Sequence, residues 1–133
     1  MIAIDTNVLV RLIAKDDSKQ LALAKAYLTK HCAPDTPALV NRVVLAEVAW
    51  VLQSLYEYSR EQIAIAVTGL LATATFTVED APEVRAALEH YRKGGIDFSD
   101  ALIATTNRRS GASCTATFDR PASKKLPEFT LIE

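Results

Sequence analysis

The spacing of apolar positions along the chain predicts a protein in which short strands alternate with helices. Apolar and β-branched runs of strand length occur at residues 2–4, 38–40, 75–78, 114–117 and 129–132. Between them, apolar residues recur at helical spacing, which predicts helices over residues 6–14, 17–30, 42–56, 60–72, 80–93 and 97–110. This order predicts one α/β domain over residues 1–133, with a short, mostly parallel sheet flanked by helices on both faces as three layers.

Polar residues mark where several of these helices begin. Asp17 and Asn41 precede two of them and are typical N-cap residues. Ser59 is followed three residues later by Gln62, which is a capping-box pattern. The basic stretch at residues 120–125 is predicted to be a solvated loop between the last two strands, with charges that would hold phosphates if an acidic site lay beside it.

The amino-acid composition excludes several classes of protein. The 133 residues are 50% apolar, which excludes a mostly disordered chain. Lys and Arg number 15 against 16 Asp and Glu, so bulk charge does not attract nucleic acid, although a local basic face is compatible with this balance. Cys32 and Cys114 are far apart in sequence, which favours free thiols in a reducing cytoplasm. We expect no signal peptide and no membrane partner, because the necessary apolar runs are missing.

Acidic residues recur in settings that favour a functional site. Asp5 and Asp119 each follow a predicted strand, and parallel strands place their carboxyl ends at one edge of a sheet. Asp100 lies in the first turn of a predicted helix, where the helix dipole favours a negative charge. Ordinary structural alternatives exist, namely helix caps for Asp5 and Asp100 and a turn residue for Asp119.

Glu47 has no comparable structural role. It lies within the apolar segment 43–50. Helical spacing groups it with four apolar residues, which favours a polar cleft over a solvated face; these are Val43, Val44, Trp50 and Val51. Carboxylates that lie close together need a cation to neutralise them. Oxygen donors without His or Cys ligands suit Mg²⁺ or Mn²⁺.

The acids fall in four motifs that resemble those of the PIN-domain nucleases. The motifs are I-D-T-N-V-L at residues 4–9, L-A-E-V-A-W-V-L at 45–52, D-F-S-D-A-L-I-A at 97–104 and T-F-D at 117–119. They appear in the family's order and span nearly the whole chain. The second motif and the compact length most resemble the VapC toxins of bacterial toxin–antitoxin pairs.

The resemblance implies a PIN-like fold and an endoribonuclease that depends on Mg²⁺ or Mn²⁺ and hydrolyses RNA with a metal-activated water. The catalytic residues and metal ligands that it implies are Asp5, Glu47, Asp100 and Asp119. The supporting residues that it implies are Thr6, Asn7, Asp97 and Thr117. It further implies a homodimer and a cognate VapB-like antitoxin that silences the enzyme.

Two other functions agree with parts of the pattern. A small phosphohydrolase would use Asp5 as its nucleophile, but such enzymes typically need a second Asp two residues later, where this chain has Asn7. A catalytically silent PIN-like binding module is the other alternative. The four intact acids argue against it.

A docking groove for the antitoxin is predicted from helix faces that the acidic site does not need. An amphipathic helix from a partner can bind such a groove, and filling of the protein's own core is the alternative for the same residues. The faces lie on the predicted helices over 17–30 and 60–72, and their residues are Leu21, Ala24, Tyr27, Leu28, Ile63, Ala66, Val67 and Leu70. The predicted groove also includes three aromatic residues between these helices in sequence, Trp50, Tyr56 and Tyr58.

Overall fold

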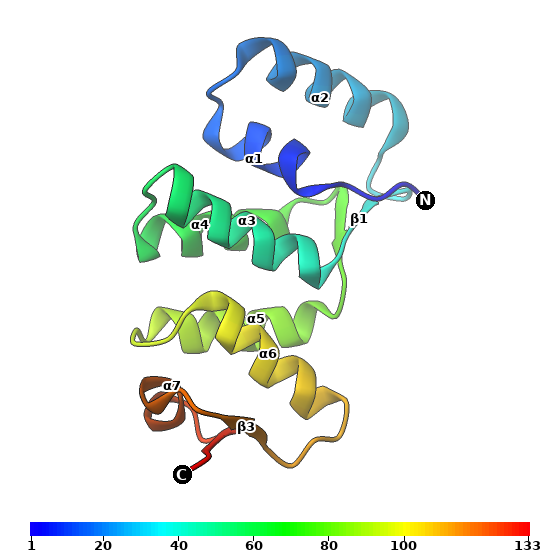
Figure 1. Ribbon diagram of the computed structural model, residues 1–133. Coiled ribbons are helices and arrows are strands. Elements are labelled where there is room, and N and C mark those ends of the chain that lie inside the picture. The colour runs from blue at the N-terminus through cyan, green and yellow to red at the C-terminus, as the bar shows by residue number, and fades with distance from the viewer. The chain divides into compact units, whose positions relative to one another are not determined.

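The computed structural model describes residues 1–133 and contains seven helices and four short strands. The chain forms two compact units, unit 1 at Met1–Glu79 and unit 2 at Asp80–Glu133, and each is described by itself. Figure 1 shows the elements of both units. None of the helices combines the length and apolar character that a membrane span requires.

Unit 1 has the predicted alternation of helices and strands. Its elements are α1 (Thr6–Ala14), α2 (Ser18–His31), β1 (Ala38–Val40), α3 (Arg42–Leu55), α4 (Arg60–Ala72) and β2 (Phe76–Val78). The Asn41 side chain accepts a hydrogen bond from the Val44 backbone N–H at 2.8 Å. Both halves of the capping box between Ser59 and Gln62 are present. These local polar signals therefore confirm the predicted starts of α3 and α4.

The strands of unit 1 are parallel, as predicted, but the first predicted strand is shorter than expected. β1 and β2 pair in parallel, with Ala38 opposite Phe76. Residues 2–4 form only a single parallel bridge, between Ala3 and Leu39. The Ile4 backbone N–H donates to the Leu39 carbonyl at 3.0 Å. The segment stays this short because α1 begins at Thr6, two residues after Ile4.

The core of unit 1 lies between α1, α3 and α4. It includes the apolar face of α4, which we expected to form part of a docking groove. Its largest fully buried side chains include Leu9, Leu45, Val48, Leu52, Ile63 and Val67. Leu70 is also buried, at 5% exposure. Of the two interpretations of this face, filling of the protein's own core is therefore correct for Ile63, Val67 and Leu70, and a docking groove is wrong for them.

Unit 2 contains one helix that the sequence did not predict. Its elements are α5 (Ala81–Arg92), α6 (Phe98–Arg109), β3 (Thr115–Thr117), α7 (Arg120–Lys125) and β4 (Phe129–Leu131). The stretch expected to be a solvated loop forms α7, and Ala122 on it is buried with Leu126 and Phe129. β3 and β4 are parallel. Parallel strands alternating with helices in both units confirm the α/β class.

The packing of α5 on α6 fixes the entrance to α6, where two of the candidate acids lie. The rings of Tyr91 and Phe98 meet edge to face, with centroids 5.8 Å apart. The turn between the helices uses Gly95 with φ +82°, and a Cβ built there would lie 2.6 Å from Lys125 Cε. Gly95 is therefore favoured for its left-handed backbone conformation, whereas the flexible Lys125 side chain could shift away from a Cβ.

Candidate active site

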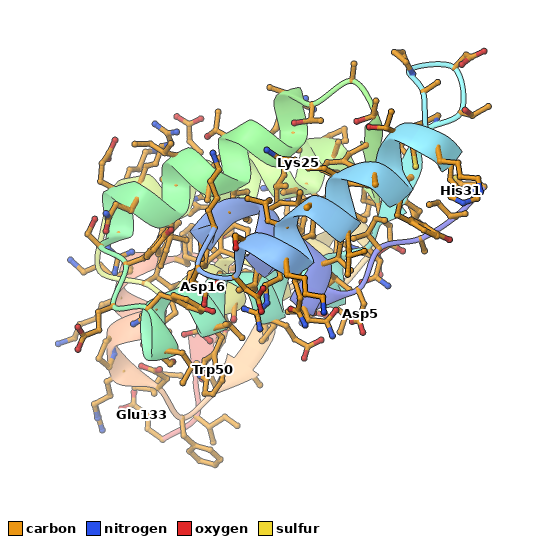
Figure 2. All side chains as sticks on the ribbon, turned by 90° about the horizontal axis from the view of Figure 1, so that it is seen from above. Asp5, Asp16, Lys25, His31, Trp50 and Glu133 are labelled. Atoms are coloured by element: carbon orange, nitrogen blue, oxygen red, sulfur yellow. The ribbon has the colours of Figure 1, made fainter.

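Asp5 occupies the junction between the bridge at Ala3 and helix α1. Its side chain is exposed, and Figure 2 shows it at the start of α1. Asp5 Oδ1 accepts a hydrogen bond from the Thr6 backbone N–H at 2.7 Å. Asp5 is therefore the N-cap of α1, as the structural alternative for this residue expected. Capping does not exclude a role as a metal ligand, because a carboxylate has a second oxygen and further lone pairs.

The first two motifs meet in unit 1 through a side-chain hydrogen bond. The Thr6 hydroxyl Oγ1 donates to Glu47 Oε1 at 3.1 Å, across 41 positions of sequence. Glu47 lies on the exposed face of α3 together with Val43 and Trp50. Val44 is buried on the core side, so grouping it with Glu47 was wrong. Thr6 therefore holds the carboxylate of Glu47 near the start of α1, beside Asp5.

Asn7 lies at a pocket between α1 and α2, and this pocket is lined in part by Ala24 and Tyr27, two of the residues expected in a docking groove. The pocket has a volume of about 510 Å³ and is lined by Asn7, Val8, Arg11, Gln20, Leu23, Ala24 and Tyr27. Figure 2 shows α2 lying across α1, with Asp16 in the connection and His31 at the far end of α2. Leu23 also lines the pocket and was not among the predicted groove residues, although it lies four residues from Tyr27 and therefore on the same side of α2.

The acids of the third and fourth motifs lie in unit 2. Asp97 occupies the N-cap position of α6, although its side chain makes no capping hydrogen bond, and Asp100 lies in the first turn. Asp119 follows β3 and caps α7, where its Oδ1 accepts from the Ala122 backbone N–H at 3.0 Å. The Asp119 backbone N–H donates to Thr117 Oγ1 at 3.0 Å. Thr117 thus fixes the backbone that carries Asp119.

Electrostatics links the three acids of unit 2. Burial raises the pKa of the Asp100 carboxyl above its ordinary value, and the charges of Asp97 and Asp119 raise it further. The charges of Asp97 and Asp119 therefore lie close enough to Asp100 to act on its carboxyl group. Such a cluster is relieved when a cation is bound among the acids.

The two arginines in the last turn of α6 are both paired. Arg108 forms an ion pair with Glu128 at 3.6 Å, and Arg109 forms one with Glu83 at 3.1 Å. Lys124 and Lys125 lie in the last turn of α7, which Asp119 caps. The basic residues that belong to the same helix as the Asp119 cap are therefore those of α7 and not those of α6.

The residues present fit a hard divalent cation by their chemistry, although neither unit alone completes a site. Unit 1 brings together Asp5, Thr6 and Glu47, and unit 2 brings together Asp97, Asp100 and Asp119. Neither unit arranges three His, Cys, Asp or Glu side chains so that they could hold a metal ion. The donors are carboxylate oxygens throughout, which suits Mg²⁺ or Mn²⁺. Convergence of Asp5, Glu47, Asp100 and Asp119 stays a prediction.

Comparison with known proteins identifies the class. The family model described as PIN domain matches residues 2–125, which include all four motifs. The chain therefore belongs to the PIN domain family, whose members are generally metal-dependent nucleases. Comparisons with curated proteins and with solved structures found no match.

Proposed function

We propose that this PIN domain is a metal-dependent endoribonuclease and the toxin of a VapBC-like toxin–antitoxin pair. The observation that carries the nuclease proposal is the hydrogen bond from Thr6 to Glu47, because it brings the acids of the first two motifs to one place. The resemblance of the second motif and of the compact length to VapC toxins supports the choice of RNA as the substrate. Free thiols at Cys32 and Cys114 agree with a reducing cytoplasm.

We further propose that residues 1–133 act as a single nuclease domain with one acidic site. The support is that the family match runs without interruption across the boundary at Glu79 and Asp80. In this proposal the metal ligands come from both units. They are Asp5, Glu47, Asp100 and Asp119, and they hold Mg²⁺ or Mn²⁺.

Each residue of the site has a role that its local structure supports. A bound divalent ion supplies neutralising charge and an activated water for attack on the phosphodiester. Thr6 orients Glu47 through their 3.1 Å hydrogen bond, and Thr117 orients Asp119 through its backbone. Lys124 and Lys125 place positive charge on the helix that Asp119 caps, which offsets repulsion between the acids and the RNA phosphates.

An RNA cleavage assay tests the nuclease proposal. Purified protein is incubated with mixed-sequence RNA in Mg²⁺ and in EDTA, and cleavage is expected only in Mg²⁺. Asp5→Ala and Asp119→Ala should each lower the rate by more than about 100-fold, since changing even a residue that only supports metal ligands costs about 10- to 100-fold. Asp35→Ala is the matched control, because Asp35 is an exposed acid in a turn outside the motifs.

Two results would replace this proposal by an alternative. Turnover of a generic phosphate ester without RNA cleavage would favour a phosphohydrolase that uses Asp5. RNA binding without cleavage in any divalent metal would favour a silent binding module. Equal loss of cleavage in both variants, with Asp35→Ala unchanged, is the result expected if both units serve one site.

A cognate antitoxin and a homodimer complete the proposal. Because the α4 face is buried, we place the antitoxin's docking site at the pocket between α1 and α2. Leu23 and Tyr27 in this pocket are 62% and 52% exposed. The expected occupant is an amphipathic helix, with a polar tail that reaches the acids. Removing that tail should restore RNA cleavage while binding persists. Loss of binding on truncation would show that the pocket does not supply the affinity.

A further inference from the structure

Unit 2 contains a pocket at the end of α6 that lies away from the candidate acids. The pocket has a volume of about 260 Å³. Asp100 lies in the first turn of α6 and Arg108 in its last turn, and eight residues of an α-helix span about 12 Å. The charged wall of the pocket is therefore distinct from the acidic site. The lining residues are Ala104, Arg108, Ala112, Ser113, Cys114, Thr115, Pro127 and Glu128.

The carboxylate of Glu128 in the pocket wall lacks hydrogen-bond donors. Its side chain is only 16% exposed, and its Oε2 atom is buried without a hydrogen-bond partner. Its Oε1 atom forms an ion pair with Arg108 at 3.6 Å, which is longer than a hydrogen bond. A buried carboxylate is costly unless hydrogen bonds satisfy its oxygens. The chain itself therefore does not supply all the donors that this carboxylate needs.

Arg108 is a weak partner for Glu128. Its side chain is 75% exposed, and an ion pair with so exposed a partner contributes little to stability. The next arginine along α6 behaves differently, because Arg109 donates a hydrogen bond to Glu83 at 3.1 Å. The Arg108 guanidinium can therefore leave Glu128 at small cost when a better donor is present.

We propose that this pocket binds a small aliphatic primary amine, whose ammonium group replaces the Arg108 guanidinium on Glu128. An ammonium group is a compact charge with three N–H donors, whereas the guanidinium is a broad planar fork. A compact group can approach the carboxylate more closely than Arg108 does. The pocket also lies at the C-terminal end of α6, where the helix dipole favours a cation.

The size and lining of the pocket select the rest of the ligand. Its volume lies below the about 300–1,000 Å³ of sites that hold drug-sized molecules, so the ligand is small. Ala104, Ala112 and Pro127 supply apolar wall for a short alkyl chain. A metal ion fits less well, because no three His, Cys, Asp or Glu side chains are grouped to hold one.

A cysteine in the pocket lining allows a direct test. Cys114 is exposed and lines the pocket, whereas Cys32 is buried in unit 1. The full chain is treated with iodoacetamide at neutral pH in a buffer without amines, and alkylation of Cys114 is followed by mass spectrometry. Added n-butylamine should slow this alkylation in a saturable way. An equal rate with and without n-butylamine would overturn the proposal.

Two related compounds show which property of the amine is recognised. Butan-1-ol has the same alkyl chain without the charge, and tetramethylammonium has the charge without an N–H donor. Neither should slow the alkylation of Cys114. If tetramethylammonium protects the thiol as well as n-butylamine does, the effect is general ionic screening and the proposal is wrong.

Variants at the two charged residues should change the affinity in opposite directions. In calorimetric titrations with n-butylamine, Glu128→Gln should weaken binding about ten-fold or more, because it removes the charged acceptor. Arg108→Gln should strengthen binding by up to about five-fold, which is the contribution of an exposed ion pair. Arg109→Gln is the matched control, since Arg109 pairs with Glu83 and does not line the pocket.

The two arms of this test do not depend on each other. Thermal unfolding of each variant checks that the fold is kept, and Arg108→Gln carries the test if Glu128→Gln fails to fold. Weaker binding of n-butylamine by Arg108→Gln would contradict the proposed exchange of cations. None of these measurements uses RNA, so the amine pocket and the proposed nuclease can be refuted separately.

Discussion

Replacing Asp100 by Asn should stabilise the metal-free protein while abolishing cleavage. In the structure, Asp100 is partly buried in the first turn of α6, near the charges of Asp97 and Asp119. Burial and the two neighbouring charges disfavour its ionised form and raise its pKa, so the carboxylate costs folding free energy at neutral pH. Asn has nearly the same size and no charge. The substitution therefore removes the electrostatic cost without leaving a cavity.

The expected gain is modest because Asp100 remains partly exposed. Interactions between partly solvated charges are typically worth about 0–1 kcal/mol each. Two repulsive neighbours and partial burial together suggest a gain of about 1 kcal/mol, which is within the range of common stabilising substitutions. For a domain of this length, 1 kcal/mol corresponds to a rise in Tm of about 4 °C.

The sign of the pH dependence follows from the raised pKa of Asp100. The folded state retains the Asp100 proton above the ordinary pKa of 3.8. The stability that this proton contributes is fully present below the unfolded pKa and is lost as pH rises through the raised pKa. The difference in Tm between Asp100→Asn and the unmodified chain should therefore vanish at low pH and reach its full value near neutral pH.

Thermal unfolding in EDTA from pH 3 to pH 8, followed by circular dichroism, measures this difference. RNA cleavage in Mg²⁺ is measured on the same preparations. Asp35→Asn is the matched control, because Asp35 is an exposed acid in unit 1, and its Tm profile should follow the unmodified chain. A lower Tm together with retained cleavage would refute the reasoning, since it would make Asp100 a structural residue of α6.

Two further predictions probe the supporting structure. Thr6→Val should lower the rate of RNA cleavage about ten-fold or more, because it removes the hydroxyl that donates to Glu47. Thr6→Ser keeps that hydroxyl and should keep most of the activity. Equal rates for the two variants in a cleavage assay would contradict this role. Ser59→Ala should lower the free energy of unfolding by about 1 kcal/mol, because it removes the capping box at α4. Thermal unfolding measures this loss, and a cleavage assay should show an unchanged specific activity.

Local signals determined most of the secondary structure of this protein. α1 spans Thr6–Ala14 and α4 spans Arg60–Ala72, as predicted. In both cases the apolar spacing and the capping residue lie within a few positions of each other, so the information is contained in the segment itself. The motifs around Asp5, Glu47, Asp100 and Asp119 were likewise sufficient to identify the family.

Tertiary structure decided which faces of these elements meet. The apolar face of α4 can fill a core or bind a partner, and only its packing against α3 shows that Ile63 and Val67 are buried. Helix α7 forms where charged residues suggested a loop, because Ala122 and Leu126 find apolar contacts that its own sequence does not contain. The bond from Thr6 to Glu47 joins residues 41 positions apart. Such contacts depend on the global path of the chain, which no local pattern encodes.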